Sequence, residues 1–263
     1  MTTKPWFINL NSHSRGKSLA RLEMRLFCFP YAGGSAALFH GFARMLPPSF
    51  ELWAANLPGH GSRLGETPIT DLNTAANRLA AALVPLIDGL PFTFWGHSMG
   101  ARLAFEVARF LRSWRIDMPV QLIVSACPGP QLPQHERCWY NLSDSQLVTE
   151  LGKYGGLPEE LLKHESQILA LFLPALRADL RMFETAKYRQ EQPLAIPITA
   201  LGSNHDPLVD VKELEAWQVQ TNGQFRLALF DGDHFFLHAL QGTILEEILD
   251  TKSQKDANFS IYL

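Results

Sequence analysis

Short apolar runs alternate with longer segments of helical periodicity along most of the chain. Six runs are typical of strands: Arg25–Phe29, Glu51–Asn56, Phe92–Trp95, Val120–Ala126, Ile198–Leu201 and Phe225–Phe230. Between them, apolar residues recur at the i, i+3 and i+4 spacing of helices that cover a sheet: Leu72–Ile87, Ala101–Trp114, Val211–Val219 and Phe236–Leu249. The alternation predicts a mainly parallel sheet with helices on both faces.

One stretch breaks this alternation. From Pro128 to Pro193 the pattern is helical and contains no convincing strand, although predicted strands lie on both sides. We therefore expect an inserted helical lid over about residues 128–193. Two predicted helices, Glu160–Leu173 and Ala175–Tyr188, supply its apolar side chains, namely Leu161, Leu162, Ile168, Leu169, Phe172, Leu176, Leu180 and Phe183. These side chains either roof an active site or only pack the lid onto the core.

Length and composition fit one catalytic domain. A chain of 263 residues with 46% hydrophobic content has enough apolar side chain for one sizeable core. We place this domain at residues 25–250, after an N-terminal extension over residues 1–24 to which we assign no function. Residues 251–263 form a mostly polar tail that we expect to fray. A monomer is the expected state.

Charge and targeting signals narrow the function classes. The net charge is −3 and no run of lysine or arginine occurs, so a nucleic-acid partner is not expected. The N-terminus lacks the apolar core of a signal peptide, and the most apolar run, around Leu169–Leu176, is interrupted by Pro174, so no membrane span is expected. The cysteines are few and lack metal or redox spacing, which favours inert thiols in a reducing cytoplasm: Cys28, Cys127 and Cys138.

A candidate nucleophile follows the third predicted strand. Phe92–Trp95 leads into residues 96–100 (GHSMG), a G-x-S-x-G motif, and a helical pattern begins directly afterwards. In this context the serine lies on a sharp, strained turn, and the two glycines leave room for neighbouring backbone. The sequence therefore predicts that Ser98 Oγ is held out of the sheet as a nucleophile. The structural alternative is a glycine-rich turn with an ordinary serine.

A serine nucleophile needs a base, and the base needs an acid that fixes its tautomer. The strand that ends at Leu201 leads into a turn-rich loop containing Asp206, and the last strand leads into a loop containing His234. The order serine, acid, histidine is that of the α/β-hydrolase fold. We predict Asp206 as the orienting acid and His234 as the general base. Asp210, at the expected N-cap of the next helix, is the second choice for the acid.

The remaining polar residues near these loops have structural explanations. Asp231 and Asp233 are expected to form turns, because aspartate side chains bind nearby backbone in such loops. His238 stands one helical turn beyond His234 and is the fallback for the base.

Two backbone amides complete the predicted site. The loop at residues 29–35 (FPYAGGS) follows an early strand, and Ala32 is the candidate donor from it, with Tyr31 next. Met99 lies at the first turn of a helix, where a free N–H and the positive end of the helix dipole favour an oxyanion. The predicted reaction is attack of Ser98 on an acyl carbonyl, followed by hydrolysis of the acyl-enzyme. It needs neither a metal nor an organic cofactor.

Four motifs together resemble a known group. Residues 29–35 (FPYAGGS), 57–63 (LPGHGSR), 96–100 (GHSMG) and 232–236 (GDHFF) occur in the order and spacing of the type II (external) thioesterases of polyketide and nonribosomal peptide synthesis. The match covers roughly Arg25 to Leu249. The resemblance implies hydrolysis of acyl groups from the phosphopantetheine arm of acyl or peptidyl carrier protein domains, which clears misprimed or stalled chains.

The resemblance carries over to the individual site residues. It implies a triad of Ser98, Asp206 and His234, an oxyanion hole made by the amides of Ala32 and Met99, and a lid that shapes the acyl pocket and the pantetheine entrance. The chain departs from the family pattern where His60 stands in place of a frequent arginine, and where residues 202–206 (GSNHD) are more polar than usual. We expect His60 to be structural.

Two other functions use the same residues. A generic carboxylesterase or lipase would share the triad, the fold and the lid, so the sequence does not separate oxygen esters from thioesters. A binding protein that kept the hydrolase scaffold is the alternative from another class, since fold does not fix function.

Overall fold

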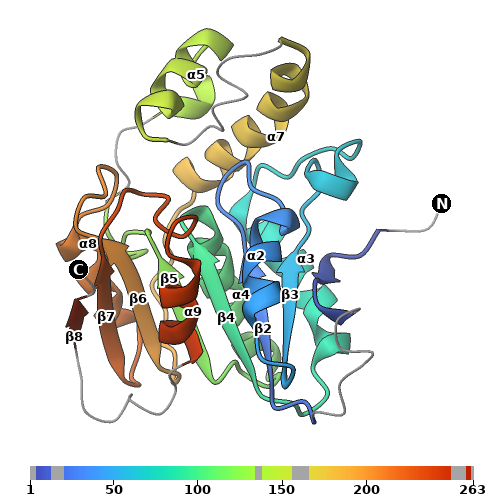
Figure 1. Ribbon diagram of the computed structural model, residues 1–263, viewed down its shortest axis with the longest axis vertical. Helices are drawn as coiled ribbons and strands as arrows, with labels where there is room; N and C mark the ends of the chain where they lie inside the picture. The colour runs from blue at the N-terminus through green and yellow to red at the C-terminus, as the bar shows by residue number, and fades with distance from the viewer. Residues whose placement is uncertain (1–3, 13–20, 134–137, 156–165, 250–258, 262–263) are drawn as a thin grey trace.

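The protein is built around one twisted sheet, shown in Figure 1. The computed structural model describes residues 4–12, 21–133, 138–155, 166–249 and 259–261. Within these residues the sheet has eight strands in the order β1-β3-β2-β4-β5-β6-β7-β8, with β1 antiparallel to β3 and the other neighbours parallel. The strands are β1 (Phe7–Asn9), β2 (Met24–Phe29), β3 (Phe50–Ala55), β4 (Phe92–His97), β5 (Gln121–Ser125), β6 (Ile198–Ser203), β7 (Phe225–Phe230) and β8 (Phe259–Ile261).

The six strands predicted from the sequence are confirmed, each within two residues at either end. The two outer strands were not predicted. β1 belongs to the segment expected to precede the domain, and its Phe7 is buried with edge-to-face contacts to Phe27 and Phe29. β8 belongs to the segment expected to fray, and it pairs with β7. The limits of 25–250 for the domain stay a prediction.

Helices cover both faces of the sheet because the side chains of each strand alternate between two apolar clusters. Phe27 and Phe94 pack with helices α3 (Leu72–Leu83) and α4 (Met99–Trp114). Cys28 and Trp95 lie on the other face, and the helices there are α2 (His40–Met45) and α9 (Gln241–Leu249).

Two predicted helices are shorter than expected. The helix predicted from Phe236 begins at Gln241, because turns occupy residues 231–239. The helix predicted over Val211–Val219 is an α-helix only as α8 (Val211–Glu215). It continues as the 3₁₀ segment η5 (Ala216–Gln220). The other described 3₁₀ segments are η1 (Ala36–Phe39), η2 (Gly61–Arg63), η3 (Val84–Leu86) and η4 (Trp139–Asn141).

The lid contains helices α5 (Asp144–Lys153) and α7 (Ser166–Glu184), which lie together at one end of the molecule (Figure 1). The sequence predicted two helices separated at Pro174, and this is wrong, because α7 runs through that proline. Proline removes one backbone hydrogen bond, but apolar packing on both sides of it holds the helix together. That packing is a lid cluster of Leu147, Leu151, Leu173, Leu176 and Leu180. Leu161 and Leu162 lie outside the described residues, as does the side chain of Ile168.

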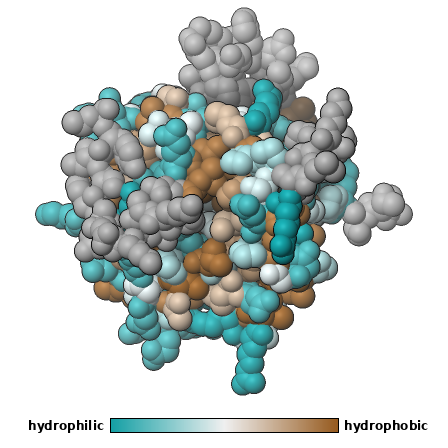
Figure 2. All heavy atoms as spheres, turned by 60° about the horizontal axis from the view of Figure 1, so that its bottom comes forward, coloured by the Kyte–Doolittle hydropathy of each residue, from teal (hydrophilic) through white to brown (hydrophobic). Residues whose placement is uncertain are grey.

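The face away from the lid comes forward in Figure 2, where apolar residues gather near the middle and hydrophilic ones project around them. Within the described residues, no helix is long and apolar enough to cross a membrane.

Candidate active site

Ser98 lies on a strained turn between β4 and α4. Its backbone has φ 54° and ψ −120°, which non-glycine residues rarely adopt. The turn is held by the Ser98 N–H, which donates to the carbonyl of Ser125 at 2.7 Å, and by the carbonyl of Ser98, which accepts from the Ala101 N–H at 3.0 Å. The strain is therefore imposed by β5 on one side and by the start of α4 on the other.

The two glycines of the motif are required by close backbone approach. A β-carbon on Gly96 would lie 2.2 Å from the carbonyl oxygen of Gly100, and one on Gly100 would lie 2.0 Å from the carbonyl oxygen of Phe29. Both distances are far below van der Waals contact. The G-x-S-x-G spacing thus lets α4 pack directly on β2 and β4, which holds Ser98 at the end of the sheet.

The predicted acid and base are joined. His234 Nδ1 lies 2.8 Å from Asp206 Oδ2, and both side chains are buried. A carboxylate only accepts hydrogen bonds, so Nδ1 carries the proton and Nε2 is left as the basic nitrogen. The other carboxylate oxygen, Oδ1, accepts the N–H groups of Leu208 at 2.8 Å and Val209 at 3.2 Å. Asp206 is thereby fixed by its own loop and aimed at the histidine.

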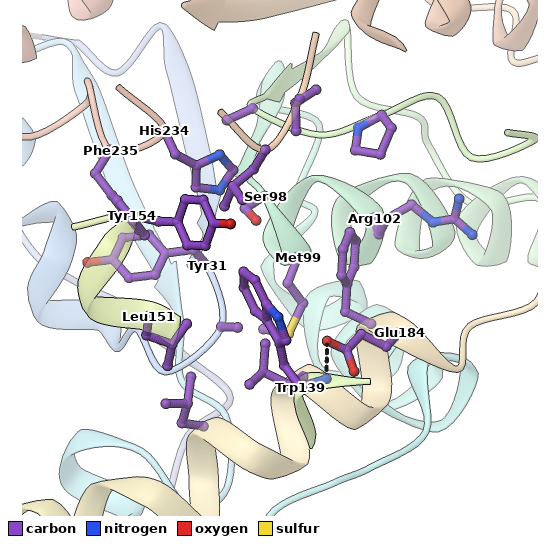
Figure 3. Close-up of a pocket in the computed structure, with 18 of the residues that line it drawn as sticks. Tyr31, Ser98, Met99, Arg102, Trp139, Leu151, Tyr154, Glu184, His234 and Phe235 are labelled. Carbon is purple, nitrogen blue, oxygen red and sulfur yellow. Dashed lines mark hydrogen bonds between the residues drawn. The ribbon is translucent and has the colours of Figure 1, made fainter. Parts of the chain in front are cut away.

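Ser98 and His234 line one pocket, together with Met99, Tyr31 and Ala32 (Figure 3). Every residue predicted for catalysis or for the oxyanion hole is therefore at this place, with Asp206 directly behind the imidazole. The pocket contains about 1050 Å³ of space not filled by protein atoms, a volume that includes open solvent. The lid side chains in its lining are Trp139, Leu151, Tyr154, Leu176, Leu180, Phe183 and Glu184. Of the two alternatives, roofing the site therefore holds for Leu176, Leu180 and Phe183. Leu169 packs within the lid, and Phe172 packs on the lid cluster and against the loop at Gly33.

Of the residues set aside from catalysis, Asp210 and Asp233 have the expected structural partners, whereas Asp231 Oδ1 lies 3.5 Å from His205 Nε2. Asp210 caps α8, where its carboxylate accepts the Glu213 N–H at 2.8 Å. Asp233 Oδ1 accepts the N–H of Phe235 at 2.7 Å, as in a local turn. His238 Nε2 lies 3.1 Å from the hydroxyl of Tyr31. Burial raises the pKa of that hydroxyl to about 12, so Tyr31 stays protonated near neutral pH.

His97, which the sequence did not single out, supports the loop of His234. Its Nε2 donates to the carbonyl oxygen of His234 at 2.9 Å, and its Nδ1 accepts from the Ser125 hydroxyl at 2.8 Å. Burial lowers the pKa of His97 well below the usual value, in keeping with this neutral tautomer. Ser203 acts similarly, since its hydroxyl donates to the carbonyl of Gly232 and links the end of β6 to the loop after β7. No sequence spacing indicates either contact.

A second unpredicted group, Asp179, ties the lid to the loop that contains Ala32. Asp179 lies on α7 and is 1% exposed, and its Oδ2 accepts the N–H of Gly33 at 2.8 Å. The same oxygen lies 2.8 Å from His60 Nε2, while His60 Nδ1 lies 3.0 Å from the carbonyl oxygen of Pro58. Both partners of His60 are acceptors, so both ring nitrogens carry protons and the imidazole is a cation. Burial lowers the pKa of His60, but the Asp179 carboxylate and the backbone contacts raise it. The net pKa of His60 lies above its usual value.

The fold and the site together define a class. A mainly parallel sheet with helices on both faces, a strained serine between β4 and α4, an acid after β6 and a histidine after β7 are the features of an α/β-hydrolase. Among the described residues, no group of three or more His, Cys, Asp and Glu side chains is arranged to hold a metal ion.

Comparison with known proteins narrows this class. The thioesterase domain family model matches residues 24–255. The gramicidin S biosynthesis protein GrsT of Aneurinibacillus migulanus is 38% identical over 92% of this chain and 91% of its own. Thioesterase PikA5 of Streptomyces venezuelae is 34% identical over 89% of this chain and 84% of its own.

Solved structures agree with this result. The type II thioesterase BorB from the borrelidin biosynthetic cluster superposes with a TM-score of 0.83 and 36% identity, over 94% of this chain and 98% of its own. RedJ, a thioesterase of the prodiginine pathway in Streptomyces coelicolor, gives a TM-score of 0.82 and 34% identity, over 86% and 89%. The chain belongs to the thioesterase family and is a thioester hydrolase similar to type II thioesterases.

Proposed function

We propose that this enzyme hydrolyses acyl groups from the phosphopantetheine arms of acyl or peptidyl carrier proteins, with Ser98, Asp206 and His234 as its catalytic triad. The observation that carries the assignment is the 2.8 Å contact between His234 Nδ1 and Asp206 Oδ2. It leaves Nε2 as a base in the same pocket as a serine on a strained turn. The similarity to proteins named for gramicidin S biosynthesis and for other biosynthetic clusters supports carrier proteins as the partners.

The reaction has two stages. His234 Nε2 takes the proton of Ser98 Oγ as this oxygen attacks the thioester carbonyl, and the N–H groups of Ala32 and Met99 stabilise the oxyanion. The tetrahedral intermediate collapses with cleavage of the carbon–sulfur bond, and the imidazolium gives its proton to the pantetheine sulfur. Water, deprotonated by the same imidazole, then attacks the acyl-enzyme and releases a carboxylic acid and the free Ser98 hydroxyl.

The partner and setting follow from the same proposal. The chain works as a monomer that meets carrier proteins in the cytoplasm. In support, Cys28 and Cys127 are buried free thiols, and Cys138 is free and exposed, as expected in a reducing compartment.

Mass spectrometry of acyl-loaded carrier proteins, before and after exposure to the enzyme, tests the proposal. We expect the wild type to release the acyl group and Ser98→Ala to lose about 10³-fold or more of the rate. Ser113→Ala is the matched control, because Ser113 is an exposed serine on α4 whose hydroxyl donates to the Phe110 carbonyl. Equal turnover by Ser98→Ala and wild type would refute the triad. Strong preference for a p-nitrophenyl ester of equal chain length would identify a carboxylesterase instead.

A further inference from the structure

The pocket has two sides as seen from Ser98, and the proposed function assigns a different part of the substrate to each. Figure 3 shows His234, Phe235 and Tyr154 on one side of Ser98 and Arg102 on the other. Because His234 protonates the leaving sulfur, the pantetheine arm lies on the histidine side. The acyl chain therefore extends along α4 toward Arg102.

Arg102 is a buried cation in the lining of this pocket. The residue is 2% exposed, and its Nε and Nη2 atoms are fully buried without a hydrogen-bond partner in the described part of the chain. Burial lowers the pKa of the guanidinium, but arginine remains protonated in proteins. Buried N–H donors without a hydrogen-bond partner are unfavourable, so these two nitrogens favour a ligand that brings an acceptor oxygen.

The neighbouring carboxylates are bonded to other groups. Glu106 is one helical turn from Arg102 and attracts its charge, but the two Glu106 oxygens accept hydrogen bonds from Arg109 Nη1 at 3.1 and 3.2 Å. Glu184, which also lines the pocket, accepts the N–H groups of Trp139 and Tyr140 at 3.2 and 3.3 Å. Within the described residues, the Arg102 Nε and Nη2 donors are left without an acceptor.

We propose that Arg102 forms a subsite for the distal end of the acyl chain, and that the enzyme favours acyl groups carrying a carboxylate several carbons from the thioester carbonyl. Arg102 lies in the first turn of α4, four residues after Ser98, which corresponds to about 6 Å along the helix axis. A carboxylate is the acceptor that matches a guanidinium best, because the bond is charge-assisted and the two groups are planar. The apolar lining, which includes Met99 and Phe183, suits the methylene chain between the two ends.

Paired substrates of equal length test this subsite. For each length from about four to eight carbons, which brackets one helical turn plus side-chain reach, the kcat/KM of a carrier-bound ω-carboxyacyl thioester is divided by that of the simple acyl thioester. This ratio is measured for wild type, Arg102→Met and Arg102→Lys. Arg112→Met is the matched control, because Arg112 lies on the same helix, pairs with Glu191 and is outside the pocket lining.

We expect the ratio to fall about 10- to 100-fold in Arg102→Met, which is the effect of one hydrogen bond to a charged group. It should fall less in Arg102→Lys and stay unchanged in Arg112→Met. An unchanged ratio in Arg102→Met overturns the subsite. An equal fall for ω-hydroxyacyl thioesters overturns the preference for an anion. If Arg102→Met does not fold, the affinity of a non-hydrolysable ω-carboxyacyl thioether is compared between wild type and Arg102→Lys. Weaker binding by Arg102→Lys supports the subsite, and equal binding overturns it. Failure of the proposed function is distinct, because the wild type would then hydrolyse no carrier thioester at all.

Discussion

Replacing Asp179 by asparagine is expected to destabilise the protein in a way that depends on pH. The carboxylate of Asp179 holds the His60 imidazolium and the Gly33 N–H, and the His60 and Asp179 side chains are 4% and 2% exposed. Asparagine keeps an oxygen of similar position for Gly33 but removes the negative charge. His60 then has no anionic partner in this contact, and its raised pKa should fall.

The size of the effect follows from burial. Breaking a buried ion pair by removing one partner costs about 3 to 5 kcal/mol, and we expect about 3 kcal/mol because the Gly33 contact survives. A histidine whose pKa is raised on folding contributes stability that is complete below its unfolded pKa, here 6.5. That stability is lost as pH rises through the folded pKa, with a slope of at most about 1.4 kcal/mol per pH unit. The difference between the two proteins should therefore be largest in acid.

Urea denaturation of both proteins at several values between about pH 5 and 9, the range in which histidines titrate, measures this difference. Burial lowers the pKa of His97 and of His238, which favours stability at higher pH, but both groups are present in both proteins and their contribution cancels. Asp144→Asn is the control, because Asp144 is 70% exposed in its pair with Arg177 and should contribute less than about 1 kcal/mol. A difference that is flat, or that grows with rising pH, would refute the ion pair.

Three further substitutions, two of them with a control variant, test the active site and its support. Asp206→Asn should lower kcat by about 10³-fold or more through loss of the correct tautomer, whereas Asp210→Asn should keep kcat, as steady-state assays of both would show. Gly100→Ala should destabilise by about 3 kcal/mol or more in denaturation experiments, because its new β-carbon meets a backbone oxygen at 2.0 Å. Gly242→Ala, with nothing within 4 Å, should instead stabilise α9 by about 0.5 to 1 kcal/mol. His97→Phe removes a buried hydrogen bond to the loop of the base and should lower kcat about tenfold, and an unchanged kcat would contradict that role.

The fold was largely predictable because its signals are local. Each central strand is an apolar run of few residues, and the strand, turn and helix around Ser98 follow one another directly in the sequence. The positions of Asp206 and His234 follow from the same logic, since each comes after a strand whose end must lie at the same edge of the sheet. Their contact needed the structure, because loop conformation is not written in spacing.

What the sequence did not predict depends on contacts between distant residues. Asp179 lies in a helical pattern of the lid, and nothing near it in the sequence indicates that it meets Gly33, 146 positions away. The sequence places Arg102 in a helical pattern, and only the structure shows that it lines the pocket. The error at Pro174 has a similar cause, since proline usually ends a helix unless the packing on both sides of it compensates.

The short strands β1 and β8 have a consequence for handling the protein. They occupy the two margins of the sheet and give the exposed backbone of β3 and β7 a hydrogen-bonding neighbour from the same chain. An uncovered margin is a template on which another molecule adds a strand. Trimming away β1, or the chain behind Leu249 with β8, would therefore keep Ser98, Asp206 and His234 but invite self-association, so solubility sets the limits of the shortest useful form.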